Sequence, residues 1–235
     1  MTPDFFSCLK NPLDFYIVRH GESDGNAAKI LQGRFEYPLS EMGRLQSAAR
    51  GRELKSAIAG AAPGKTQLFS SPLGRARETA LIIAEESGLP GPTVIDGLME
   101  MDLGIWTGKT WDEVKNDDPS LWAAFMARSW DAIPEAESSS ALYERALRLW
   151  AALRDAAMEK GAEKIVVVTH GGLIQWLLKT TFRCRTWFPL FPISNCGLSK
   201  LCVVPRPDEL SAWLNWEEID SRLPHLGSEP RGFPS

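Results

Sequence analysis

Three short apolar runs separated by segments with helical spacing constrain the fold of this chain more than any other feature. The runs cover residues 14–20, 66–71 and 164–170. Apolar runs of this length, bounded by polar or turn residues, are typical of strands buried on both faces of a parallel sheet. Strands that alternate with helices along the chain predict an α/β fold with a mainly parallel central sheet.

The intervals between these runs carry helix signals. Ser40 supplies a capping oxygen for a helix whose apolar residues recur at near-helical spacing until residues 60–64, where Gly and Pro break it. Gly88 and Gly161 each stand where a helix is predicted to end. The other predicted helices cover residues 72–87, 138–160 and 173–181.

The C-terminal part of the chain carries different signals. Residues 197–204 and 211–218 resemble two strands of a late hairpin, and the tail from Leu223, rich in Pro and Gly, is expected to be loose. A chain of 235 residues fits one large domain better than two small ones. We therefore expect a single domain over residues 1–235, with a core at 14–204 and a C-terminal strand and loose tail at 205–235.

Composition and charge argue against several classes of partner. The apolar fraction of 44% and the charged fraction of 24% are those of an ordinary globular protein. A net charge of −4 gives no general attraction to nucleic acid or to an anionic membrane, and no apolar run approaches membrane-spanning length. Any anion must therefore be bound by a few arginines gathered in one place, and we expect neither nucleic acid nor a membrane as a partner.

Cysteine usage indicates a reducing compartment. The four cysteines form no C-x-x-C pair, and residues 1–12 lack the pattern of a signal peptide, so free thiols in the cytoplasm are expected. No cluster of carboxylates or of His and Cys has the spacing of metal ligands, and we expect neither a metal nor another cofactor.

Polar residues follow each of the three predicted strands. His20 ends the first strand, Ser70 and Ser71 end the second, and His170 ends the third. In a parallel sheet, ligands bind outside the carboxyl ends of the strands, so these side chains are expected to meet there. The sequence therefore predicts one site built from three distant segments.

The types of residue at these positions favour phosphate chemistry. Arg19 precedes His20, and arginine binds phosphate oxygens with a planar fork while a neutral histidine can attack phosphorus. His170 is followed by two glycines that open a helix, whose N-terminus attracts anions. Arg75 and Arg77 lie in the first turns of another helix, where a cation is unfavourable without an anionic partner.

Each of these features also has an ordinary structural interpretation. A lone Arg-His pair is more often structural, His170 resembles a capping histidine, and two helical arginines are usually solvated. The segment LMEMDLGIWTG at 98–108 adds Glu100 and Asp102 as candidate acids, which could equally lie in a solvated loop. The order of all the motifs together is more specific than any one of them.

The set RHGES, PLSEMG, SSPLGRARETA, EMDLGIWTG and VVVTHGGL, in this order, resembles the histidine phosphatase superfamily, which includes cofactor-dependent phosphoglycerate mutase. The resemblance covers residues 15–204 and implies a three-layer α/β/α sandwich. It implies that His20 is the nucleophile that becomes phosphohistidine, that Glu100 is the proton donor and that Asp102 is the nearby alternative. The other residues that the resemblance assigns to the phosphate or substrate site are Arg19, Asn26, Gln32, Gly33, Arg75 and His170.

One departure from the family pattern lies before Glu137, where this chain has Ala136 and the family often has glycine. The departure touches no catalytic group but leaves the local loop geometry open.

The resemblance implies a reaction in two steps. Arg19, Arg75 and a protonated His170 would hold the phosphoryl oxygens while neutral His20 attacks in line. Glu100 would donate a proton to the leaving alcohol, and water activated by the same carboxylate would then hydrolyse the phosphohistidine. The expected function is a metal-independent phosphomonoesterase acting on small organic phosphates.

Two other functions stay open. Phosphoglycerate mutases of this family carry the motif RHGES-x-WN and a long insert after the acid motif. This chain has no Trp before Asn26, and its segment at 101–137 is short. A catalytically weak protein-binding member of the same fold is the second alternative, and the complete motif set argues against it.

The substrate and the oligomeric state are not determined by the sequence, and a homodimer is one alternative. Four of the nine tryptophans fall between residues 106 and 130, after the candidate acid. They are interpreted first as packing in the core or a lid, and alternatively as an aromatic entrance for an organic phosphate with an apolar or planar part.

Overall fold

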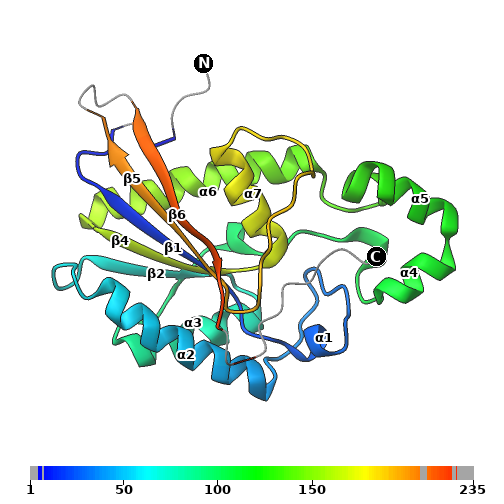
Figure 1. Cartoon of the computed structure of the whole chain (residues 1–235), viewed down its shortest axis with the longest axis horizontal. Coiled ribbons are helices and arrows are strands. Elements are labelled where there is room, and N and C mark those ends of the chain that lie inside the picture. The colour runs from blue at the N-terminus through cyan, green and yellow to red at the C-terminus, as the bar shows by residue number, and fades with distance from the viewer. Residues whose placement is uncertain (1–4, 7, 207–210, 224–225, 227–235) are drawn as a thin grey trace.

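A six-stranded sheet crosses the protein, with helices on both faces (Figure 1). The computed structural model describes residues 5–6, 8–206, 211–223 and 226. The order of the strands in the sheet is β3-β2-β4-β1-β5-β6. The strands are β1 (Leu13–Arg19), β2 (Thr66–Ser70), β3 (Thr93–Val94), β4 (Lys164–Thr169), β5 (Leu198–Pro205) and β6 (Ala212–Ser221).

The sheet is parallel over β1 to β4 and antiparallel at the β5–β6 edge. Three parallel strands and the late hairpin were predicted, but β3 was not, because two residues carry no periodic signal. Strand β4 lies between β1 and β2, so that Arg19 pairs with Thr169 and Ser70 with Val168. This order brings the carboxyl ends of the three predicted strands side by side.

Four longer helices cover the two faces of the sheet. In Figure 1, α2 (Glu41–Ile58) and α3 (Gly74–Ser87) lie below the sheet, whereas α6 (Ser139–Lys160) and α7 (Gly171–Thr181) lie above it. The Ser40 hydroxyl accepts the Gly43 amide at the start of α2, as its position predicted. Gly88 and Gly161 adopt the left-handed conformation that ends α3 and α6.

The core forms two layers because side chains alternate along buried strands. Tyr16 and Val18 of β1 pack in the cluster shared with α2 and α3, whereas Phe15 and Ile17 pack in the cluster shared with α6 and α7. The predicted three-layer α/β/α sandwich is therefore confirmed.

Short helices occupy the irregular region between residues 96 and 132. They are η1 (Asp96–Leu98), η2 (Gly104–Trp106), α4 (Trp111–Asp117), α5 (Pro119–Arg128) and η3 (Ser129–Ala132). Helices α4 and α5 extend beyond the end of the sheet (Figure 1). Trp106 and Trp130 are buried against Phe125, as the packing interpretation predicts, but Trp130 also lines the cavity described below. A further helix, α1 (Asp24–Ala27), has only four residues and was not predicted.

Two described residues of the predicted tail contact the rest of the domain. Leu223 is buried, and the Gln46 side chain donates a hydrogen bond to the Leu226 carbonyl at 3.0 Å. The rest of the predicted tail, at 224–225 and 227–235, lies outside the described residues. No helix within the described part of the chain is long and apolar enough to cross a membrane.

Candidate active site

The carboxyl ends of β1, β2 and β4 bring two histidines together. His20 follows β1 and His170 follows β4, and their ring centroids lie 5.1 Å apart. Both side chains are buried, His170 completely. The polar residues at the ends of these strands therefore lie together at this edge of the sheet, as the sequence predicted.

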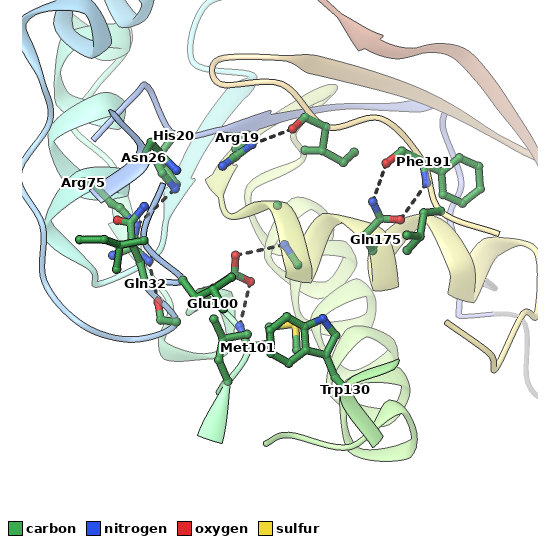
Figure 2. A pocket seen from close by; sticks show the side chains of 18 of the residues that line it. Arg19, His20, Asn26, Gln32, Arg75, Glu100, Met101, Trp130, Gln175 and Phe191 are labelled. Atoms are coloured by element: carbon green, nitrogen blue, oxygen red, sulfur yellow. Dashed lines mark hydrogen bonds between the residues drawn. The ribbon is translucent and has the colours of Figure 1, made fainter. Parts of the chain in front are cut away.

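The His20 ring is held in one orientation. Its Nδ1 atom lies 2.7 Å from the Gly21 carbonyl oxygen, which can only accept, so Nδ1 carries the proton. The Nε2 atom then presents a lone pair, 3.3 Å from the Arg75 Nε donor (Figure 2). A neutral imidazole whose unprotonated Nε2 faces the cavity has the form that a phosphoryl acceptor requires, once a phosphoryl group replaces the lone pair as the partner of Arg75 Nε.

Arg75 is the buried cation closest to this lone pair. Its Nη atoms donate to the carbonyls of Phe35 at 2.8 Å and Gly33 at 2.7 Å, which fixes the guanidinium plane. Burial lowers the pKa of Arg75, and the charges of Glu100 and Glu36 oppose that shift. Arg77, the other candidate on this helix, is exposed to solvent.

Arg19 brings a second guanidinium to the same space. Its Nη1 atom donates to the Ile193 carbonyl at 2.7 Å, an interaction drawn in Figure 2. It packs against the start of α7, where a Cβ atom at Gly171 would lie in van der Waals contact with Arg19 Nε, at 3.4 Å. Arg19 and Arg75 therefore approach His20 from two different elements.

His170 is anchored on one side only. Its Nε2 atom lies 2.8 Å from the Ser71 hydroxyl, and its buried Nδ1 atom has no hydrogen-bond partner among the described residues. Burial lowers the pKa of His170 well below its ordinary value, and the nearby Arg75 and His20 lower it further. The surroundings of His170 therefore disfavour its protonated form, which the resemblance implies when phosphate is bound.

Glu100 caps helix α7 from the opposite side of the cavity. Its carboxylate oxygens accept the amides of Gly172 and Leu173 at 3.1 Å each, and one oxygen also accepts its neighbour's amide (Figure 2). Asp102 instead accepts the Gly104 amide at 3.0 Å and lies 3.8 Å from Arg34. Only Glu100 lines the cavity, so the geometry favours it over Asp102 as the acid.

The predicted site residues gather around one cavity of about 550 Å³. Those that line it are Arg19, His20, Asn26, Gln32, Gly33, Arg75 and Glu100. His170 lies directly behind them, against His20. The structure therefore brings together segments that stand up to 151 positions apart, from Arg19 to His170.

Asn195 belongs to this site and was not predicted. Its amide nitrogen donates to the His20 carbonyl at 3.2 Å and to the Asn26 side-chain oxygen at 3.1 Å. Asn195 follows no strand or helix pattern in the sequence, so no local signal points to it. Asn195 therefore links the cavity-lining Asn26 to the His20 backbone.

Arg145 and Glu137 fix the loop that carries Glu100, and they too were not predicted as site residues. Arg145 Nη1 donates to the carbonyls of Gly97 at 3.0 Å and Met99 at 2.6 Å. The Glu137 carboxylate accepts hydrogen bonds from the other two guanidinium nitrogens of Arg145, from Nε at 2.9 Å and from Nη2 at 2.8 Å. Alanine fits at position 136, where the family often has glycine, because the residue with positive φ in this turn is Glu135 and not Ala136.

Among the described residues, no group of three or more His, Cys, Asp or Glu side chains is arranged to hold a metal ion. The positive charge that faces the cavity comes from Arg19 and Arg75.

Comparison with known proteins agrees with this geometry. The family model of the histidine phosphatase superfamily (branch 1) matches residues 15–215. A metal-independent phosphoserine phosphatase from Arabidopsis thaliana is 34% identical over 94% of this chain and 87% of its own length. A probable phosphoglycerate mutase GpmB from Yersinia pestis is 30% identical, covering 86% of this chain and 90% of its own.

The solved structures include a mycobacterial glucosyl-3-phosphoglycerate phosphatase in complex with VO3. It has a TM-score of 0.76 and 27% identity, covering 89% of this chain and 99% of its own. The chain belongs to the histidine phosphatase superfamily. The predicted family is confirmed, and so is the predicted phosphatase activity on phosphate monoesters.

Proposed function

We propose that this protein hydrolyses small organic phosphate monoesters by transferring the phosphoryl group to His20 Nε2. The observation that supports this most directly is the fixed His20 ring, with its proton on the Gly21 side and its lone pair beside the Arg75 guanidinium. Buried cations beside a neutral nucleophile stabilise negative charge that builds on the phosphoryl oxygens.

Arg19, Arg75 and His170 would hold those oxygens. The unpartnered Nδ1 atom of His170 is a buried nitrogen that a phosphoryl oxygen can satisfy. A phosphate dianion counters the charge of Arg75 and Arg19, so its binding favours the protonated form of His170 that burial and these charges disfavour. The pKa of His170 is therefore expected to rise when phosphate binds.

The bonds change in two steps. In the first, a bond forms between His20 Nε2 and phosphorus while the ester P–O bond breaks, and Glu100 supplies the proton that the leaving alcohol needs. In the second, a water oxygen attacks phosphorus, gives its proton to the Glu100 carboxylate and releases phosphate from His20. Both steps need Glu100 on the leaving-group side, where the carboxylate lines the cavity.

The intermediate provides the test. Enzyme quenched during turnover of a ³²P-labelled monoester should carry label that is labile in acid and stable in base. His20→Ala should remove both label and turnover, whereas His225→Ala, which changes the one histidine outside these motifs, should keep both. Label that survives in His20→Ala would assign the nucleophile to another residue.

A phosphoglycerate mutase is the alternative that a relative supports, since one 30% identical is named a probable phosphoglycerate mutase. In this chain the short helices of the 101–137 segment leave no long insert to close the site against water. With 3-phosphoglycerate and 2,3-bisphosphoglycerate, interconversion should be slow while aryl phosphates are hydrolysed. Rapid formation of 2-phosphoglycerate would reverse this ranking.

The setting of the reaction is also proposed. The substrate is a small molecule, with no nucleic-acid or membrane partner, in the cytoplasm, and the whole of residues 1–235 forms one domain. A single cooperative unfolding transition and a single protease-resistant fragment are the expected results. Sedimentation analysis would distinguish a monomer from a homodimer.

A further inference from the structure

The cavity extends well beyond the space that a phosphoryl group needs. Its volume of about 550 Å³ falls in the range of pockets that enclose a drug-sized ligand. The phosphate-binding groups occupy one end, and the remaining volume must face the alcohol part of a monoester. The chemistry of that outer part therefore selects the substrate.

The outer walls are apolar and aromatic. Three chain segments build them: the loop after α1, the acid loop with α4 and η3, and the loop after α7. The apolar side chains that line this part are Ile30, Leu31, Met101, Leu103, Trp111, Trp130, Trp187, Leu190, Phe191, Pro192 and Ile193. Figure 2 shows Met101 and Trp130 directly beyond the Glu100 carboxylate.

Charge is confined to the phosphate end. Among the described residues that line the cavity, the charged side chains are Arg19, Arg75 and Glu100. Arg34, which lies beside the acid loop, is engaged by the Glu100 carbonyl and the Glu137 carboxylate at 3.2 Å each.

The polar side chain of the outer wall is already paired. The Gln175 amide donates to the Phe191 carbonyl at 2.6 Å and accepts the Phe191 amide at 3.0 Å, as Figure 2 shows. Gln175 therefore fixes the loop after α7. Because its amide already bonds the Phe191 backbone, it is not a strong hydrogen-bond partner for a second anionic group of a substrate.

A second anionic group on the substrate would therefore lose its hydration without gaining a cation. Burying an unpaired carboxylate or phosphate is strongly unfavourable. An apolar ring, in contrast, gains free energy in proportion to the surface that it removes from water, and aromatic walls add favourable ring contacts.

We propose that this enzyme prefers monoesters whose alcohol carries a ring-sized apolar body and no second strong anion. This inference rests on the proposed phosphatase function and adds the class of substrate. It ranks phosphoserine, 3-phosphoglycerate and bisphosphates as poor substrates, although relatives of this chain are named for phosphoserine and phosphoglycerate compounds.

The test compares phosphates of primary alcohols, so that leaving-group reactivity varies little. For the wild type, kcat/KM should be about 30-fold or more higher for 2-phenylethyl phosphate than for ethyl phosphate, since the phenyl ring is buried. L-phosphoserine and 3-phosphoglycerate should fall at or below ethyl phosphate. Equal or better turnover of the two carboxylated substrates would overturn the inference.

Two variants test the walls directly. Trp111→Ala, which truncates a partly buried lining residue, should reduce the advantage of 2-phenylethyl phosphate about tenfold and affect ethyl phosphate much less. Trp213→Ala is the matched control, because Trp213 is an exposed residue of β6 that does not line the cavity. Equal losses on both substrates in Trp111→Ala would contradict an aromatic binding wall.

Leu190→Arg places a cation in the outer wall at a partly buried position. It should raise kcat/KM for 3-phosphoglycerate and lower it for 2-phenylethyl phosphate. If kcat/KM changes for neither substrate, Leu190 does not face the alcohol, and the loop after α7 is not a wall of the substrate site.

The ³²P label on His20 separates the two levels of the proposal. Labelled enzyme that prefers phosphoserine would overturn the substrate class and leave the phosphatase function intact. Enzyme that neither forms the label nor hydrolyses any monoester of the panel would overturn both.

Discussion

The two ends of the cavity differ in both chemistry and origin. The phosphate end combines His20, Arg75 and His170, which lie at strand ends or in the first turn of a helix and are almost completely buried. The outer walls come from short helices and loops on both sides, and several of their side chains are partly exposed, including Trp111 and Leu190.

This difference separates two tasks. Strand ends in a parallel sheet are fixed by hydrogen bonds on both sides, so they hold reacting groups in a rigid arrangement. Loops can change in length and sequence without disturbing the sheet, so they are suited to select the alcohol. Substitutions at the phosphate end should therefore affect every substrate alike, whereas substitutions in the walls should change the order of preference.

Arg75 offers the largest expected effect at the phosphate end. Arg75→Ala should lower kcat about 10³-fold on all monoesters, because it removes a preorganised cation from the developing charge. Arg77→Ala is the matched control, since Arg77 lies on the same helix but is exposed. Steady-state kinetics on alkyl and aryl phosphates would measure both, and a loss confined to one substrate would break the proposed separation of tasks.

Glu100 stands at the border of the two regions and should distinguish between leaving groups. Glu100→Gln should slow 2-phenylethyl phosphate about 10²-fold, because an alkoxide leaves poorly without a proton. It should slow para-nitrophenyl phosphate much less, since that leaving group hardly needs one.

Asp102→Asn is the control for the acid, because Asp102 lies in the same loop but accepts the Gly104 amide. It should show no such split between the substrates. A split that appears only in Asp102→Asn would transfer the role of acid to that residue.

Arg145 should act through the position of Glu100. Arg145→Ala removes donors to the carbonyls of Gly97 and Met99, so kcat for alkyl phosphates should fall about tenfold through misplacement of the acid. Para-nitrophenyl phosphate should respond less, and KM should change little.

The conservative variant Arg145→Lys should restore part of the loss, since an ammonium cannot reach all four acceptors. Arg154→Ala, on the same helix, is the control, because Arg154 donates to the Phe5 carbonyl far from the acid loop in sequence. Equal losses on alkyl and aryl phosphates in Arg145→Ala would indicate general destabilisation instead of positioning.

The smallest expected effect is that of a chelator. The positive charge at the phosphate end is proposed to come from arginines and His170, so excess EDTA should leave kcat and KM unchanged for every substrate. Activity lost to EDTA and restored by a divalent ion would show that the phosphate end needs a metal and that the arginines and His170 do not supply all of its positive charge.

Much of the phosphate end could be predicted because local patterns mark it. His20 and His170 follow apolar runs that are long enough to be recognised as strands, and Arg75 opens a helix with clear start and end signals. The short elements β3 and α1 escaped prediction, because two or four residues carry no periodicity. The strand order, which places β4 between β1 and β2, also has no local signal.

The residues that support the site could not be predicted. Asn195 contacts the His20 carbonyl across 175 positions, and Arg145 reaches the acid loop from the middle of α6. Such contacts depend on which elements become neighbours, and that is decided by packing.

The sequence by itself determined the family and the layered α/β fold, because these rest on motifs and on the periodicity of buried strands. The same motifs support the proposal of His20 as nucleophile. The tertiary structure decided which of Glu100 and Asp102, and which of Arg75 and Arg77, lines the cavity, because each pair shares one segment and only packing turns one member toward it. It also lowers the pKa of His170 and makes the outer walls apolar, because burial and the surrounding charges come from segments distant in the sequence.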